Sequence, residues 1–283
     1  MRSRIERLLP AIRVLGFVGA GAILVFMAIR AARDLDLRNV TWWPLPFAFA
    51  GVAAWWLLGA RGWAILLTGR SGRQDMSMWC RTQALRYLPG GIWAPASRAV
   101  AISGGVVDRV SMVATDNAIA LCAALGIGSI AFTATGDVRW LPAVAVTGAP
   151  YLAARVLGHR TRISSTRTLR ATWNYVTAFA AYSLAAVLVQ TAVSGLHDPL
   201  AIAGAAAIGW SAGFVVVIAP SGAGVRELIY VALLSDQFPT AETAAAGLTL
   251  RVLTIVAELA VLFVVAGPGP DARRRADETT ARR

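Results

Sequence analysis

The chain is dominated by apolar segments close to the length that a helix needs to cross a membrane, about 20 residues for roughly 30 Å of hydrocarbon. Hydrophobic residues make up 57% of the 283 residues and charged residues only 15%, which is unlike an ordinary soluble domain. The sequence therefore predicts an all-α integral membrane protein, a polytopic bundle of about seven or eight transmembrane helices with broken or re-entrant segments. The predicted crossings lie near residues 14–29, 44–67, 111–132, 140–157, 172–193, 200–219, 225–238 and 241–265.

The charges of the chain predict its orientation. All 27 basic residues are arginine, against 15 acidic residues, and they gather between the apolar runs. This distribution is typical of the positive-inside pattern and of attraction to anionic headgroups, and not of the basic face of a nucleic-acid-binding domain. We therefore expect the N-terminus, the 155–170 loop and the polar, arginine-rich tail at 267–283 to be cytoplasmic in a cell-membrane protein. This arrangement requires eight crossings, because with seven the tail would lie outside.

The first predicted crossing follows a basic N-terminus and resembles the start of a signal peptide. Because many further apolar runs follow it, we expect 14–29 to remain as an uncleaved transmembrane helix. Aromatic residues flank the second crossing at Trp42, Trp43 and Trp63, where a membrane interface favours them, and Arg61 is placed to reach the headgroups.

One stretch interrupts the apolar pattern near the C-terminal end. Ala219–Glu227 reads A-P-S-G-A-G-V-R-E, and its proline and glycines break a helix at membrane depth. Such a break is tolerated only where protein or a water-filled cavity surrounds the backbone, and ionisable residues beside it indicate a functional site. The segment 225–238 is then a short helix that continues from the break.

The chemistry of this stretch predicts an anion site. Glycines allow backbone N–H groups to face a ligand, a helix N-terminus contributes a partial positive charge, and an arginine offers bidentate contact with phosphate or carboxylate. The candidate ligand-binding residues here are Pro220, Ser221, Gly222, Gly224, Arg226 and Glu227. The alternative is that the glycines only allow close helix packing and that Arg226 pairs with a buried acid.

A second unusual stretch covers 70–110, which is too basic to cross a membrane and too apolar to lie free in water. Within it, 86–98 reads R-Y-L-P-G-G-I-W-A-P-A-S-R, an interfacial or re-entrant element expected to break at Pro89, Gly90, Gly91 and Pro95. The alternative is an amphipathic cytoplasmic loop. Candidate ligand-binding residues in this element are Arg86, Tyr87, Pro89, Gly90, Trp93 and Arg98.

Isolated charges within predicted crossings complete the candidate site. Arg251 and Glu258 share one helix face but lie about 10 Å apart along it, so that each needs a partner elsewhere. Asp116 lies in the first two turns of its predicted helix, 111–132. We therefore expect Asp116, Arg226, Glu227, Arg251 and Glu258 to line one cavity.

Signatures of metal, cofactor and catalytic sites are missing from the sequence. Cys80 and Cys122 lack the spacing of a zinc site or a disulfide framework, and His159 and His197 lack the second histidine and carboxylate of a helical metal site. The sequence contains no Walker A, G-x-S-x-G, H-E-x-x-H or G-x-G-x-x-G motif. We therefore predict no metal and no cofactor, and no sequence feature pairs a nucleophile with a base.

Two motifs together resemble the lysylphosphatidylglycerol synthase transmembrane family, also described as flippase-like or UPF0104 proteins. The first family motif often reads K-Y-L-P-G followed by an aromatic residue, matched by Arg86, Tyr87, Leu88, Pro89, Gly90 and Trp93. The second is commonly P-G-G-x-G-x-R-E, matched at Pro220, Gly222, Gly224, Arg226 and Glu227, with Ser221 in place of a glycine. Asp116 stands where the family usually has a glutamate.

The resemblance spans nearly the whole chain and implies a lipid-handling function. In full-length synthases a separate soluble domain performs aminoacyl transfer, and this chain is therefore not expected to be an enzyme of that kind. The membrane region of the family is associated with moving a phospholipid between leaflets, and other relatives with polyprenyl-phosphate sugar pathways. The resemblance thus implies a protein that binds or translocates an anionic lipid. The alternatives are an accessory subunit of a lipid-modifying transferase and a membrane transferase.

Overall fold

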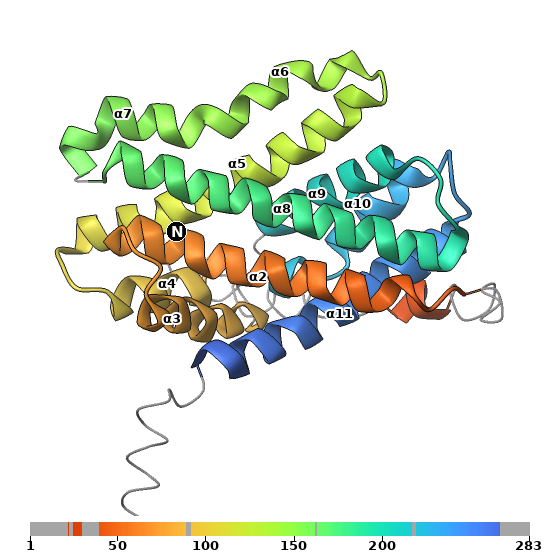
Figure 1. Cartoon of the computed structure of the whole chain (residues 1–283), viewed down its shortest axis with the longest axis horizontal. Helices are drawn as coiled ribbons and strands as arrows, with labels where there is room; N and C mark the ends of the chain where they lie inside the picture. The colour runs from red at the N-terminus through yellow and green to blue at the C-terminus, as the bar shows by residue number, and fades with distance from the viewer. Residues whose placement is uncertain are drawn as a thin grey trace, which may run out of the picture.

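The structure is a computed structural model that describes residues 22, 25–29, 40–88, 92–161, 163–216 and 219–266. Every regular element in these ranges is a helix, and the long helices cross one another at an angle within one bundle (Figure 1). The predicted all-α class is therefore confirmed. Most of the predicted first crossing, 14–29, and the whole tail, 267–283, lie outside the described residues.

Four helices are long and apolar enough to span a membrane, which indicates an integral membrane protein. They are α2 (Pro44–Thr68), α5 (Val106–Ala134), α8 (Ser165–Ser194) and α11 (Thr240–Ala266). These helices contain four of the predicted crossings, 44–67, 111–132, 172–193 and 241–265. Helix α5 begins five residues before the predicted start, so that Asp116 lies in its third turn and not in its first two.

The predicted crossing at 140–157 is broken into short pieces. It contains η3 (Val138–Trp140), α6 (Leu141–Val144), η4 (Ala145–Gly148) and α7 (Ala149–Thr161), which pack against α5 and α8. Pro150 has no N–H to offer the Val146 carbonyl, and its ring crowds that carbonyl, which explains why the backbone tightens into the 3-10 turn of η4. None of these pieces is a continuous helix of membrane-spanning length.

The interrupted stretch forms a helical hairpin. Helix α9 (Pro199–Val215) runs in from the end of the bundle at which α8 finishes, η5 (Pro220–Gly222) follows the break, and α10 (Val225–Leu234) runs back along α9. Ser221, Gly222 and Gly224 adopt positive φ angles of 50°, 68° and 80°. The predicted crossings 200–219 and 225–238 are therefore two shorter helices, of 17 and 10 residues, joined by a left-handed break.

The 70–110 region forms a second hairpin, made of α3 (Arg73–Gln83), η2 (Ala84–Tyr87) and α4 (Trp93–Ala101). Contacts with α2 show how far this hairpin extends into the helix bundle. Asp75 accepts a hydrogen bond from Thr68 at the end of α2, whereas the Arg86 guanidinium lies over the ring of Trp56. Thr68 and Trp56 are about 18 Å apart along a helix by the usual rise per residue. Helix α4 returns, because Ala101 and Ile102 line a surface cavity together with Leu67 and Thr68.

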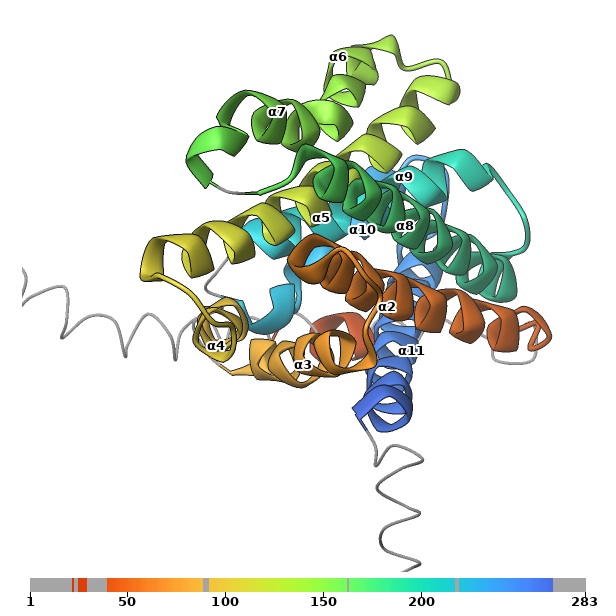
Figure 2. The ribbon, with the colours of Figure 1, turned by 60° about the vertical axis from the view of Figure 1, so that its left-hand side comes forward.

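The two hairpins enter from opposite ends of the bundle, and η2 contacts η5 where they meet. In Figure 2, α3 and α4 lie side by side beneath α2 and α5. Pro95 lies in the first turn of α4, where a proline is tolerated because that N–H has no helical partner, so the predicted break at Pro95 is wrong. Pro89, Gly90 and Gly91 lie outside the described residues.

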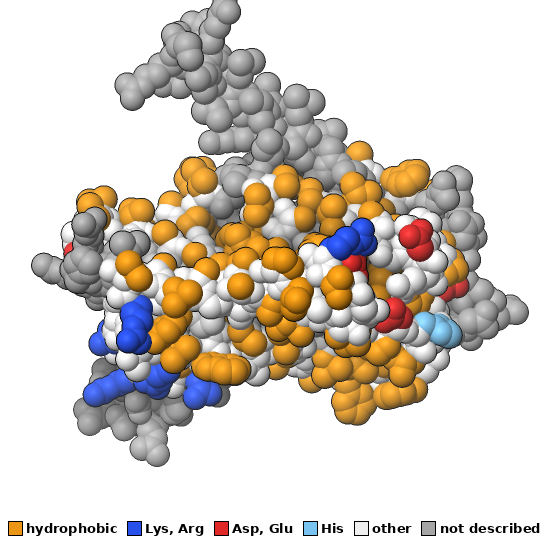
Figure 3. Space-filling view, turned by 90° about the horizontal axis from the view of Figure 1, so that it is seen from above, with side chains coloured by type: hydrophobic (Ala, Val, Ile, Leu, Met, Phe, Trp, Pro, Cys, Tyr) orange, Lys and Arg blue, Asp and Glu red, His pale blue; other side chains and the backbone are white. Residues whose placement is uncertain are grey.

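The two ends of the bundle differ in charge. The basic end, where α2 and α11 finish and α5 and α8 begin, carries Arg70, Arg73, Arg81, Arg109, Arg167 and Arg170, against Asp75 and Asp108. The opposite end carries Asp137, Arg139, His197, Asp198, Asp236 and Glu242. On the face shown in Figure 3, hydrophobic side chains are spread between a left end with basic side chains and a right part that carries acidic side chains, a histidine and a further basic group.

Several arginines of the basic end cap helices. Arg73 donates hydrogen bonds to the carbonyl oxygens of Val264 and Val265, at 2.8 and 3.2 Å, and Arg81 donates to that of Ala266 at 2.9 Å. Arg167 and Arg170 from α8 likewise donate to carbonyl oxygens at the C-terminal end of α2. The last carbonyls of a helix lack partners within the helix and carry partial negative charge, so these arginines also stabilise the fold.

Candidate functional site

The hairpin tips enclose a cavity of about 310 Å³ in the middle of the bundle. Its walls combine aromatic rings from α2, α8 and α9 with polar side chains from both hairpins and α5. The aromatic wall is formed by Trp55, Trp56, Phe179 and Trp210, whose rings pack mainly edge to face. The charged lining residues are Arg86, Arg98, Asp116 and Arg226.

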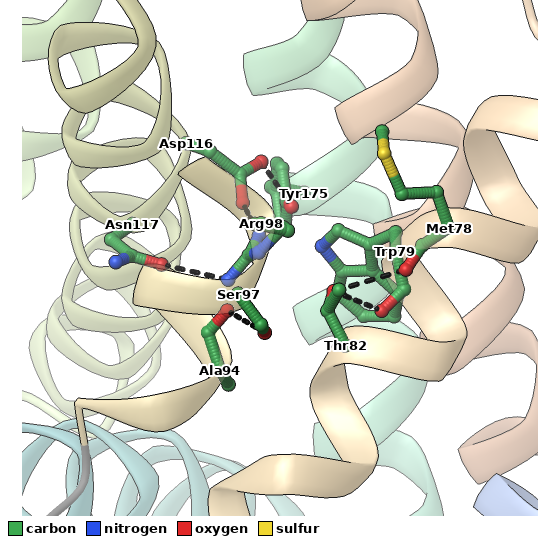
Figure 4. Close-up of polar contacts among 9 residues, drawn as sticks. All are labelled: Met78, Trp79, Thr82, Ala94, Ser97, Arg98, Asp116, Asn117 and Tyr175. Carbon is green, nitrogen blue, oxygen red and sulfur yellow. Dashed lines mark hydrogen bonds and ion pairs between the residues drawn. The ribbon is translucent and has the colours of Figure 1, made fainter. Parts of the chain in front are cut away.

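Arg98 and Asp116 form a buried ion pair on one side of this cavity (Figure 4). Their side chains are only 1% and 2% exposed. Asp116 also accepts a hydrogen bond of 2.6 Å from the hydroxyl of Tyr175, and Arg98 donates a longer one, 3.4 Å, to the Asn117 side chain. The Arg98 guanidinium lies 5.2 Å from the centre of the Trp63 ring. Trp63 is therefore a buried partner of Arg98 and not the interfacial residue that the sequence predicts.

A smaller cleft lies on the other side of the hairpin tips, between α10, α11 and η2. Arg251 donates a 2.8 Å hydrogen bond to Glu227 and a 2.9 Å hydrogen bond to the Ser221 hydroxyl. Glu227 in turn accepts a 2.8 Å hydrogen bond from the backbone N–H of Gly224 and thereby caps its own helix. Arg251 thus ties the left-handed break to α11.

Arg86 and Glu258 form the third ion pair of the region, at 2.9 Å. The Tyr87 hydroxyl donates a 2.6 Å hydrogen bond to the same carboxylate oxygen of Glu258. Tyr87 belongs to η2, outside the four spanning helices, and burial raises the pKa of its hydroxyl, so that Tyr87 stays a neutral donor. The other carboxylate oxygen of Glu258 and the Nε of Arg86 are buried and have no hydrogen-bond partner among the described residues.

Arg226 differs from the other three arginines. Its guanidinium lies over the Trp210 ring, 5.3 Å from the centroid, and its Nε is buried without a hydrogen-bond partner in the described part of the chain. No carboxylate of residues 40–88, 92–161, 163–216 or 219–266 forms an ion pair with it. The alternative of a pairing between Arg226 and a buried acid therefore fails for these residues.

Small residues of α9 make room for Arg226. A Cβ added to Gly213 would overlap the Arg226 side chain, and one added to Gly209 would lie 2.9 Å from the Arg226 carbonyl oxygen. Gly209 and Gly213 are four residues apart, the spacing that brings two membrane helices into close contact. The glycines thus act in packing as well, and this packing turns Arg226 toward the cavities.

The expected single cluster of charges is divided between two sites. Asp116 lines the 310 Å³ cavity, while Glu227 and Arg251 line the cleft, and Glu258 is held behind Arg86. Arg86, Ser221 and Arg226 line both spaces and form the wall between them. Of the other candidates, Gly222 lines the larger cavity and Trp93 begins α4 with an exposed side chain, while Pro89 and Gly90 lie outside the described residues.

Sequence reasoning missed most of the aromatic wall. Trp56, Tyr175, Phe179 and Trp210 lie within apolar runs, where nothing in the local pattern distinguishes them from other core residues. Only the packing of α2, α8 and α9 brings their rings around the cavity. Asn117, a further residue of the cavity lining, could have been identified from the sequence, because an amide beside the carboxylate of Asp116 is unusual in a membrane-length helix.

The fold and the site define a helical membrane protein with two hairpins that meet at a partly charged cavity. The sequence matches no family model, and no curated protein matches it.

Proposed function

We propose that this protein binds a lipid with an anionic, phosphate-bearing headgroup at Arg226 and moves it between the leaflets of the cell membrane. The observation that carries the proposal is the absence of an acidic partner for Arg226 among the described residues. A cation in a low-dielectric site is costly without a counter-charge, and a phosphate accepts the forked hydrogen bonds of a guanidinium. Trp210 and the other rings of the cavity provide apolar contact for the rest of the lipid.

The arrangement of the hairpins supports translocation as well as binding. Broken helices that meet near the middle of a membrane form the substrate sites of several transporters. Here the cavity and the cleft share a wall that consists of Arg86, Ser221 and Arg226. Small movements of the two hairpin tips would change whether these residues are accessible from the cavity or from the cleft. The resemblance of both motifs to the flippase-like family supports the same proposal.

Replacing Arg226 by glutamine tests the proposal. We expect the variant to lose lipid translocation by about tenfold or more, because the uncompensated cation is removed. Unfolding stability should stay equal or rise, since no ion pair within the described residues is broken. The assay reconstitutes the purified chain in liposomes with fluorescent phosphatidylglycerol and measures the lipid that a membrane-impermeant quencher cannot reach.

Arg139→Gln is the matched control, because Arg139 is exposed and, within the described part of the chain, forms its ion pair with Asp137 at the opposite end of the bundle. It removes the same charge and should leave translocation unchanged. If liposomes that contain the wild-type protein exchange lipid between leaflets no faster than protein-free liposomes, translocation is excluded. Equal rates for wild type and Arg226→Gln would exclude the proposed role of Arg226.

We also infer that the basic end faces the cytoplasm, as the positive-inside rule requires. In a Cys80→Ala/Cys122→Ala background, Ser71→Cys marks the basic end and His197→Cys marks the opposite end, and both positions are exposed. A membrane-impermeant maleimide should label position 197 in intact cells and position 71 only after permeabilisation. The reverse pattern would invert the orientation.

A further inference from the structure

The charges around the two spaces almost cancel. Four arginines, Arg86, Arg98, Arg226 and Arg251, line the cavity or the cleft. Three of them form ion pairs with Glu258, Asp116 and Glu227. The side chains of these three acids are no more than 5% exposed. Among the described residues the site therefore carries one uncompensated positive charge, and this charge belongs to Arg226.

We propose that the site selects headgroups by charge and takes a single negative charge, so that it prefers a phosphodiester monoanion to a phosphomonoester dianion. This inference rests on the proposed function. One negative charge neutralises the buried site, whereas a second one would remain uncompensated in a low-dielectric surrounding. Neutralising the second charge would require one of the three paired arginines to leave its carboxylate, which would then lie buried without a partner.

The free hydrogen-bond donors agree with this limit. Arg251 already donates to Glu227 and Ser221, and Arg98 donates to Asp116 and Asn117. Several buried donors have no partner among the described residues, and two of them, the Nε atoms of Arg226 and Arg86, belong to side chains that line both spaces. The others around the larger cavity are the Nε of Arg98 and the indole N–H groups of Trp56, Trp79 and Trp210. Two such donors on one shared wall suit the oxygens of one phosphate. Arg86 can use its Nε in this way while one terminal nitrogen continues to bond Glu258.

The preference is the opposite of what a simple basic surface would show. Arginines in water attract a dianion more strongly than a monoanion because the Coulomb energy grows with charge. A buried site with a single spare charge reverses this order, because the cost of burying the second charge exceeds the added attraction. Selectivity for the monoanion is therefore a specific signature of the charge balance around Arg226.

Two lipids that differ by one methyl group test the inference. Phosphatidic acid and its methyl ester, phosphatidylmethanol, share the same acyl chains, and at about pH 8 the first is mostly a dianion and the second a monoanion. Binding to the purified chain in neutral detergent is measured by native mass spectrometry with both lipids in competition. We expect phosphatidylmethanol to bind about tenfold or more tightly than phosphatidic acid.

Two variants change the charge of the lining without removing an arginine. Asn117→Asp adds a carboxylate of the same shape beside Arg98 and brings the net charge of the site to zero. This variant should bind phosphatidylmethanol about tenfold more weakly. Gln83→Lys adds a second spare charge to the cavity lining and should shift the preference toward phosphatidic acid. Asn117→Ala and Gln83→Ala are the neutral controls, which separate the effect of charge from that of side-chain loss.

The outcomes separate this inference from the proposed function. If the wild-type chain binds neither lipid, the proposed function fails together with the inference. If it binds both lipids with equal strength or prefers phosphatidic acid, the charge limit is wrong while anionic-lipid binding stands. Unchanged lipid preferences in Asn117→Asp and Gln83→Lys would likewise overturn the charge limit alone.

Discussion

Replacing Arg98 by leucine is expected to lower the unfolding free energy by roughly 3–5 kcal/mol, the cost of leaving a buried charge without its partner. Asp116 is 2% exposed, and after the substitution its carboxylate would keep the hydrogen bond from the Tyr175 hydroxyl but would have no cationic partner among the described residues. The stability is measured by titrating the purified protein in mixed micelles with a denaturing detergent. The expected loss is large because Arg98 and Asp116 join α4 to α5 within the bundle.

A double variant identifies the cause of this loss. Arg98→Leu/Asp116→Leu should recover most of the stability, because replacing both members of a buried ion pair by apolar residues is often neutral. Adding Tyr175→Phe removes the donor that the double variant leaves without an acceptor. Arg139→Leu, at an exposed ion pair, should leave the unfolding free energy almost unchanged, because water already solvates both charges. A double variant as unstable as Arg98→Leu would show that shape, and not charge pairing, holds α4 in place.

Replacing Gly222 by alanine is expected to disrupt the hairpin tip, at a cost of roughly 2–4 kcal/mol. Two effects add at this position. Gly222 has a φ of 68°, which is unfavourable for a residue with a Cβ, and that Cβ would lie 2.5 Å from the Gly213 carbonyl oxygen. The Cβ would meet backbone atoms of Gly213, which cannot rotate away as a side chain can, so that the hairpin must shift. Because Arg226 follows directly on the break, lipid translocation should fall in parallel with stability.

Gly136→Ala is the matched control for backbone conformation. Gly136 also has a positive φ, 98°, but a Cβ added there meets no atom within 4 Å. Gly136→Ala should lower the unfolding free energy only by the cost of a left-handed backbone conformation, about 1–2 kcal/mol, and should leave translocation intact. Equal losses in unfolding free energy for the two variants would show that the close approach of Gly222 to Gly213 contributes nothing.

Ser221 shows how a sequence departure acquires a structural meaning. The resembling motif has glycine where this chain has Ser221, and Ser221 adopts a left-handed φ of 50° that glycine would accept without strain. The Ser221 hydroxyl accepts a hydrogen bond from Arg251, which glycine could not provide. The serine therefore adopts a less favourable backbone conformation than glycine would, but it provides a hydrogen bond that links the break to α11.

Much of the helical architecture could be predicted from the sequence. The four long helices follow from apolar length, since a membrane-spanning segment must satisfy its backbone hydrogen bonds internally. The break at 219–227 follows from proline and glycine chemistry, and it occurs where predicted. The segment at 140–157 was harder to predict, because apolar length is averaged over the segment whereas Pro150 acts on a single turn.

The candidate site was only partly predictable. The sequence identified the rare charges in apolar surroundings, Asp116, Arg226, Glu227, Arg251 and Glu258, because such residues are costly in a membrane. It could not assign their partners, which lie 24 residues away for Arg251 and Glu227 and 172 residues away for Arg86 and Glu258. Pairing depends on which helix faces meet, and no local pattern encodes that choice.

The sequence by itself determined that the chain is helical, that it is suited to a membrane, and that the stretch from Ala219 to Glu227 breaks a helix beside an arginine. These features depend on local chemistry: apolar length, the missing N–H of proline and the free φ of glycine. Only the tertiary structure decided which of four arginines has no acidic partner among the described residues. Three carboxylates from α5, α10 and α11 pair with Arg98, Arg251 and Arg86, and Arg226 is left with Trp210. The physical reason is that charge neutralisation in a low-dielectric interior depends on distances of a few ångströms, which only the packing of distant helices sets.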